Sequence, residues 1–210
     1  MEFSIRGIGI IKEADIKMDG LTVIAGSNNS GKTTVGRALY AVTSAVEDLA
    51  EKQQQDQAKA VFYRIRKIVE PFDGWLSRSR FLSRKEEVSD DLISEVIGIN
   101  HIYNPGKRDY YIDLLFRLCE SMEKGSFIEL LIDNLRDVVG NSESAIRNEW
   151  EDHKEKIQKE CLGAREFVES FQQQTKKEFA YKMIEETLAV EFSNQAQSYI
   201  TVDEGGISKL

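Results

Sequence analysis

Apolar and polar positions alternate along the start of the chain, and this predicts β-strands. One alternation covers residues 3–10, with a slip at one of its glycines, and a second covers 14–18. Side chains that repeat at a spacing of two lie on one face of a strand. Asp19-Gly20 favours a tight turn, because both residues tolerate positive φ. The apolar, β-branched run 21–25 then predicts a short strand buried on both faces.

From residue 31 the apolar spacing changes to three and four, which predicts helices. The expected helices share this spacing and cover residues 31–59, 60–70, 86–97, 109–123, 126–139 and 142–188. The last has a weak point at Gly163, and its spacing fits either an amphipathic helix or a short coiled coil. Residues 198–202 have β composition again, a turn follows, and Ile207 begins a returning strand.

Composition places the chain among soluble globular proteins. Its 36 acidic and 28 basic residues give a net charge of -8, which argues against a whole surface built to neutralise nucleic acid. No apolar run approaches the ~20 residues that span a bilayer, and the N-terminus lacks the basic region of a signal peptide. Cys119 and Cys161 each stand alone, which excludes a disulfide framework and a cysteine metal site. We therefore expect a cytoplasmic protein with no membrane association.

A glycine-containing loop at residues 26–34 joins the predicted buried strand to the first helix. Its sequence is Gly-Ser-Asn-Asn-Ser-Gly-Lys-Thr-Thr, which matches the spacing G-x-x-x-x-G-K-[ST]. Gly26 lets the chain leave the strand sharply, and Gly31 lets the backbone come close to a phosphate. The amides between them, including that of Ser30, form an anion-binding nest with the free N–H groups and dipole of the helix.

The remaining loop residues also have mechanical reasons. Lys32 places a point charge between the β- and γ-phosphates, and Thr33 offers its hydroxyl to Mg²⁺. Asn28 and Asn29 suit the loop because Asn accepts left-handed backbone geometry. The sequence therefore predicts a nucleotide site at these residues, with Lys32 as its catalytic residue; the alternative is a glycine-containing loop without a ligand.

Residues 5–9, Ile16 and 21–34 together resemble the start of ABC-type ATPase heads of the SMC, RecF and OLD-like class, often described as AAA-family ATP-binding proteins. Those families open with a β-meander and continue into G-x-N-[GN]-x-G-K-[ST]. Asn28 matches the Asn of that pattern, and Asn29 stands where Gly is commoner. The resemblance implies ATP and Mg²⁺ as ligands, with Thr34 at the α-phosphate and Arg6 near the nucleotide.

The resemblance also implies an α/β fold, the N-terminal lobe of an ABC-type P-loop NTPase with a β-meander and a large helical insertion. Residues 1–45 would form the nucleotide-binding lobe, 46–188 the helical lobe with a possible short coiled coil at 142–188, and 189–210 strands returning to the head. A parallel sheet buries its nucleotide strand between neighbours joined by crossovers. After residue 40 few β-branched runs exist to supply them, so we expect the front part of a longer protein, incomplete without a C-terminal half. The alternative is that a second polypeptide completes the sheet.

The resemblance implies a second half that carries a signature segment, a Walker B strand ending in Asp-Glu, and a switch His. No Ser-Gly-Gly-like signature segment exists. Residues 127–134 end an apolar run in Asp133, but Asn follows and the helical period continues, so a buried helix face is the alternative to a Walker B strand. Asp203-Glu204 imitates Walker B better, although the glycines after it favour a hairpin tip. Gln195 or Gln197 is a candidate Mg²⁺ contact.

The resemblance implies an ATPase that is inactive as this chain alone. Hydrolysis would need the missing half and a homodimer of ATPase heads, in DNA repair or defence against foreign DNA, with a possible nuclease partner. Two alternatives stay open. One is a stand-alone small-molecule P-loop kinase with the arginines at 78–84 as a lid, and the other is an interaction module switched by nucleotide.

Basic and aromatic residues interleave over residues 62–85. This pattern suits contact with DNA or RNA through backbone neutralisation and base stacking. A solvated helix face with anchoring aromatic residues is the alternative. The basic residues are Arg64, Arg66, Lys67, Arg78, Arg80, Arg84 and Lys85.

Overall fold

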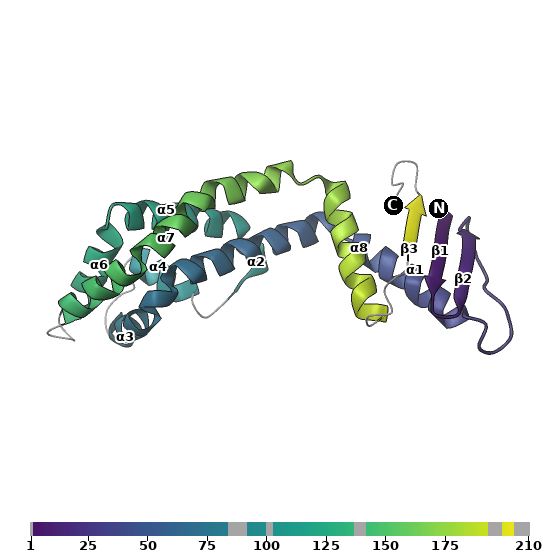
Figure 1. The fold of residues 1–210 in the computed structure, drawn as a ribbon, viewed down its shortest axis with the longest axis horizontal. Helices are drawn as coiled ribbons and strands as arrows, with labels where there is room; N and C mark the ends of the chain where they lie inside the picture. The colour runs from purple at the N-terminus through teal and green to yellow at the C-terminus, as the bar shows by residue number, and fades with distance from the viewer. Residues whose placement is uncertain (1, 84–91, 100–102, 137–141, 193–198, 204–210) are drawn as a thin grey trace. The chain divides into compact units, whose positions relative to one another are not determined.

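The computed structural model describes residues 2–83, 92–99, 103–136, 142–192 and 199–203 (Figure 1). The chain divides into two compact units. We call residues 1–50 with 174–210 the sheet unit, and residues 51–173 the helical unit. The described residues are mostly helical and include a small antiparallel sheet, which is compatible with an α/β fold. None of the described helices is both long enough and apolar enough to span a membrane.

The sheet has three strands in the order β2-β1-β3. Strands β1 (Glu2–Ile8) and β2 (Ile11–Lys17) form an antiparallel hairpin that closes at the pair Ile8↔Ile11. The turn lies at Gly9, whose φ of 58° favours glycine. Strand β3 (Tyr199–Asp203) pairs antiparallel with the other edge of β1, as Figure 1 shows. The predicted return of β structure near the end of the chain is therefore confirmed.

The predicted strand at residues 21–25 is wrong. Residues 21–26 belong to no strand, and Leu21 and Val23 are 90% and 77% exposed. Asp19-Gly20 does turn the chain, but the strand hairpin is the earlier one at Gly9. A run of consecutive apolar residues becomes a strand where neighbours cover both of its faces. All residues from 21 to 30 are exposed, so the described chain supplies no such cover.

Helix α1 (Lys32–Val46) covers the buried face of the sheet, and helix α8 (Lys176–Phe192) packs against α1. The core of this unit consists of β-strand residues that alternate and α1 residues at helical spacing, joined by one α8 residue: Phe3, Ile5, Ile8, Ile11, Val35, Ala38, Val42, Ala45 and Ile184. Arg37, in the first half of α1, joins it to the end of α8, because its guanidinium binds the Glu191 carboxylate at 3.0 Å and lies over the Phe192 ring.

The expected single helix at 142–188 is two helices. Helix α7 (Ser142–Gln173) ends before Thr175, and α8 begins after it. The Thr175 amide donates to the Glu178 carboxylate at 2.8 Å, while the Glu178 amide donates to the Thr175 hydroxyl at 3.2 Å. This capping box starts a new helix. Residues 174–188 consequently lie in the sheet unit rather than in the helical lobe that the sequence predicted, and no long coiled coil forms from them.

The helical unit contains α7 and seven further helical segments within the described residues. These are α2 (Leu49–Val69), η1 (Glu70–Phe72), α3 (Asp73–Ser83), α4 (Leu92–Ile99), α5 (Arg108–Glu123) and α6 (Ser126–Leu135), with the short η2 (Pro105–Lys107) before α5. The expected continuation of the first helix through residue 59 is interrupted at Asp48, whose φ is 51°. The interpretation of residues 127–134 as a buried helix face is confirmed, since they form α6.

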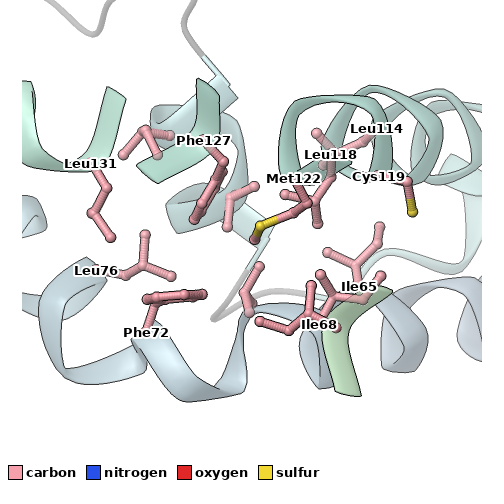
Figure 2. Close-up of a cluster of buried hydrophobic side chains, with 14 of the residues drawn as sticks. Ile65, Ile68, Phe72, Leu76, Leu114, Leu118, Cys119, Met122, Phe127 and Leu131 are labelled. Carbon is pink, nitrogen blue, oxygen red and sulfur yellow. The ribbon is translucent and has the colours of Figure 1, made fainter. Parts of the chain in front are cut away.

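One apolar core joins these helices, and Figure 2 shows its centre. Ile65 and Phe72 lie on one side, with Leu118 and Phe127 facing them, and all four side chains are fully buried. The rings of Phe72 and Phe127 lie 5.9 Å apart. Helix α7 continues through Gly163 without a break, and this glycine makes room for a neighbour: a Cβ there would lie 2.7 Å from Nη2 of Arg64.

Candidate phosphate-binding loop

The loop that precedes α1 bends through two left-handed residues. Asn29 has φ 65°, and Gly31, the N-cap of α1, has φ 89° and ψ 6°. Asn and Gly are the residue types that adopt this geometry at least cost. The left-handed geometry that suits Asn in this loop is therefore found at Asn29, and Asn28 does not adopt it.

Lys32 lies at the first position of α1 and reaches back across the loop. Its ammonium group donates to the carbonyl oxygen of Gly26 at 2.8 Å and to that of Ser27 at 2.5 Å. The loop therefore curves around a positive charge, and both ends of the motif lie at the same place. A positive charge here adds to the positive end of the α1 dipole.

Both glycines of the motif lie close to neighbouring side chains. A Cβ at Gly26 would lie 2.8 Å from the Ser30 hydroxyl oxygen, and one at Gly31 would lie 2.9 Å from Cγ1 of Ile11. Gly9 in the hairpin turn lies near the same helix end, since its Cβ position is 3.9 Å from Cγ2 of Thr34. The end of the β1–β2 hairpin thus supports the loop. Sequence reasoning did not find this support, because it placed the hairpin turn at residues 19–20.

The start of α1 has the properties of an anion site. Gly31 provides no side-chain cap, and the first turn contains no acidic residue. The first helical hydrogen bond is from the Val35 amide to the Gly31 carbonyl at 3.0 Å, so the amides before it point out of the helix. Thr33 is exposed, and residues 26–34 include no acidic side chain that would compete with an anion.

The structure does not bring every predicted residue to the loop. The Arg6 guanidinium forms an ion pair with Glu13 at 2.8 Å across the hairpin, and both side chains are exposed. Asp203 is the last residue of β3 and pairs with Glu2. Because β1 and β3 are antiparallel, Asp203 lies at the opposite end of the sheet from the Gly9 turn, roughly 20 Å away at about 3.3 Å per residue. This favours the hairpin interpretation of Asp203 over Walker B; Glu204, Gln195 and Gln197 lie outside the described residues.

The basic residues of the 62–85 segment already have partners within the helical unit where the structure describes them. Arg64 donates to the Glu160 carbonyl at 2.8 Å and lies over the Phe167 ring, and Lys67 pairs with the Glu160 carboxylate at 2.5 Å. The hydrogen bond from Lys67 lowers the pKa of Glu160. Arg78 lies over Trp75. Paired cations neutralise phosphates less readily, which favours the helix-face interpretation; Arg80, Arg84 and Lys85 have no described side chains.

Comparison of the chain with protein-family models, with curated proteins and with solved structures finds no match. The site therefore has to be interpreted from its own residues. Within the described chain, three or more His, Cys, Asp or Glu residues nowhere gather into a group able to hold a metal ion. A divalent cation at the loop would take its protein ligand from the Thr33 hydroxyl, which suits the oxygen preference of Mg²⁺.

Proposed function

We propose that residues 26–34 bind the triphosphate of ATP with Mg²⁺, and that the chain is the N-terminal portion of an SMC/RecF/OLD-like ATPase. One observation carries the proposal. The Lys32 ammonium lies inside a loop whose left-handed Gly31 opens an uncapped helix, so a positive charge and outward-pointing amides converge on one exposed place. Such a convergence of charge and amides recognises phosphate.

The roles of the residues follow from their positions. The loop amides and the α1 N-terminus bind phosphate oxygens, and Lys32 exchanges its carbonyl partners for the β- and γ-phosphates. Thr33 contacts Mg²⁺, and Thr34 lies toward the α-phosphate. Bound Mg²⁺ supplies charge neutralisation of the triphosphate. Gly26, Asn28, Asn29 and Ser30 shape the loop.

The exposed apolar segment supports the idea that the ATPase is incomplete here. Leu21, Val23 and Ile24 are 90%, 77% and 40% exposed directly before the loop. Every described strand pair is antiparallel, so the neighbours that would bury this segment in a parallel sheet come from elsewhere. Hydrolysis would then depend on a further half with the signature and Walker B residues and on a homodimer of heads, as the resemblance implies. DNA repair or defence against foreign DNA in the cytoplasm, with a nuclease partner, is the role that this class suggests.

Nucleotide titration of the whole chain with a fluorescent ATP analogue tests the loop. Lys32→Ala should weaken affinity by about tenfold or more, because a hydrogen bond to a charged group is worth about 1.5–3 kcal/mol. Lys59→Ala is the matched control, since it removes the same charge from an exposed position on α2 and should leave affinity unchanged. Equal affinity of wild type and Lys32→Ala would refute the site.

Two further measurements separate the remaining possibilities. Thr33→Ala should lose the gain in affinity that Mg²⁺ provides, whereas Thr43→Ala, on the same helix with its hydroxyl donating to Leu39, should keep it. The chain alone should show negligible ATP turnover. Phosphoryl transfer to a small acceptor by this chain alone would favour the kinase instead.

A further inference from the structure

Cys119 and Cys161 are distant in sequence but meet in the core of the helical unit. Cys119 lies on α5 and Cys161 on α7, and these two helices pack against each other. Both side chains belong to the same apolar cluster, with exposures of 6% and 3%. Figure 2 shows the Cys119 side chain turned into this core. The two thiols are hydrogen-bonded to each other, and both are free.

The surroundings make the two thiols unequal. The hydrogen bond from Cys119 lowers the pKa of Cys161, and it raises the pKa of Cys119, which keeps its proton. The Arg64 guanidinium favours the thiolate form of both cysteines. Burial and the Glu123 carboxylate favour the protonated thiol of both. Arg64 is fixed at this turn of α7 by its bonds to the Glu160 carbonyl, next to Cys161. The two thiols therefore differ in acidity, and Cys161 is the more acidic of the pair.

We propose that Cys119 and Cys161 are an oxidisable dithiol, which a peroxide converts into an intramolecular disulfide between α5 and α7. The Cys161 thiolate attacks one peroxide oxygen: an S–O bond forms, the O–O bond breaks and hydroxide leaves. Cys119 then gives up its proton and attacks the Cys161 sulfur: the S–S bond forms and the S–O bond breaks. With hydrogen peroxide, two thiols and one peroxide yield one disulfide and two waters.

The proposal is independent of the nucleotide loop, because both cysteines lie in the helical unit. Burial makes the reaction slow, since the oxidant reaches the sulfurs only when the helix pair opens locally. Neither residue has a second cysteine nearby in sequence, so their spacing argued against a disulfide. The packing of α5 on α7 nevertheless brings the two thiols together.

The test is mass spectrometry of the whole wild-type chain after incubation with hydrogen peroxide. The sample is then unfolded, alkylated and digested. We expect loss of both alkylation sites together, a linked peptide containing Cys119 and Cys161, and recovery of both thiols after dithiothreitol. Two alkylatable thiols at every peroxide concentration, separate sulfinic acids, or links only between chains would each overturn the proposal. This measurement needs no variant, so it stays decisive even where a substitution prevents folding.

Two single variants test the order of attack. In Cys119→Ser the hydroxyl still donates to Cys161, so a dimedone probe should trap Cys161 as its sulfenic acid. In Cys161→Ser, trapping at Cys119 should be slower by about fivefold or more, because its thiolate fraction is smaller. Circular dichroism confirms that each variant is folded. Faster trapping at Cys119 than at Cys161 would overturn the assigned nucleophile.

Discussion

Leu118 in the helical unit and Leu21 in the sheet unit are the same side chain in opposite surroundings. Leu118 is 0% exposed in a core that helices α2 to α7 share, whereas Leu21 is 90% exposed. The contrast extends to their neighbours: around the candidate loop, Ile10 and Val23 are also more than half exposed. The two units thus differ in whether the described residues can cover the apolar surface that the sequence contains.

The reason lies in how each element is satisfied. A helix completes its backbone hydrogen bonds internally and needs cover for only one apolar stripe. In the helical unit, neighbouring helices provide that cover. The segment 21–25 is apolar at every position, so it needs partners at both edges and on both faces. In the sheet unit β2 and β3 pair with the two edges of β1 and α1 covers one face of the sheet, while residues 21–25 stay exposed. The comparison teaches that the unit with the candidate site is the one in which the described residues leave an apolar segment uncovered.

Truncating the two leucines gives the largest expected difference. Leu118→Ala should cost about 2–5 kcal/mol of unfolding free energy, because it removes buried methyl groups and leaves a cavity. Leu21→Ala should change it by less than about 0.5 kcal/mol, since an exposed side chain loses little. Urea denaturation followed by circular dichroism measures both. A comparable loss for Leu21→Ala would mean that residues 21–25 are covered in solution, and it would contradict the difference in exposure between the two leucines.

Glycine substitutions on either side of the start of α1 give the next largest effect. Gly31→Ala should destabilise the sheet unit by about 1–2 kcal/mol, the usual cost of a left-handed Ala, and the new Cβ would also meet Ile11. Gly36→Ala is the matched control, because it lies inside α1 with nothing within 4 Å of its Cβ position. It should stabilise by about 0.5–1 kcal/mol. Thermal unfolding of the two variants should therefore shift in opposite directions; shifts in the same direction would show that Gly31 is not strained.

The helices and the loop geometry were predictable because their signals are local. The spacing over 109–123 predicts α5, whose observed bounds differ by one residue at the start. The left-handed geometry at Asn29 and Gly31 follows from residue type. The start of α8 at Thr175 also has a local signal, because T-x-x-E is a capping pattern. The continuous apolar spacing on both sides of Thr175 obscures it.

The features that failed depend on partners distant in sequence. Nothing within residues 21–25 states whether neighbours will cover them, so β-branched composition predicted a strand where none forms. Arg6 was expected near the nucleotide, but it forms an ion pair with Glu13, which faces it across the β1–β2 hairpin. This pairing depends on the strand register. The meeting of Cys119 and Cys161 depends on how α5 packs on α7. Tertiary pairing of this kind leaves no periodic trace in one sequence.

The smallest expected effect is on the pH dependence of the unfolding free energy, and it comes from the Glu95–Arg117 pair in the helical unit. Arg117 donates to both carboxylate oxygens of Glu95, at 2.8 and 2.6 Å, and this lowers the pKa of Glu95 below 4.5. Tyr110 also bonds to Glu95, and burial together with that carboxylate raises the pKa of Tyr110 to about 12. The unfolded chain therefore binds the Glu95 proton at a higher pH than the folded one.

Stability from Glu95 is thus complete above its unfolded pKa and is lost as pH falls from about 4.5 through the lowered folded value. Glu95→Gln should lower the unfolding free energy at pH 7 by about 1 kcal/mol, since the pair is partly exposed. The variant should also lose less unfolding free energy than the wild type as the pH falls below about 4.5. Glu155→Gln, at an exposed position on α7, removes the same charge and should leave the curve unchanged. Urea denaturation at pH 7, 5 and 3.5 measures both variants. Equal slopes for Glu95→Gln and wild type would place the acid sensitivity outside this pair, at other paired carboxylates such as Glu160, whose pKa is also lowered.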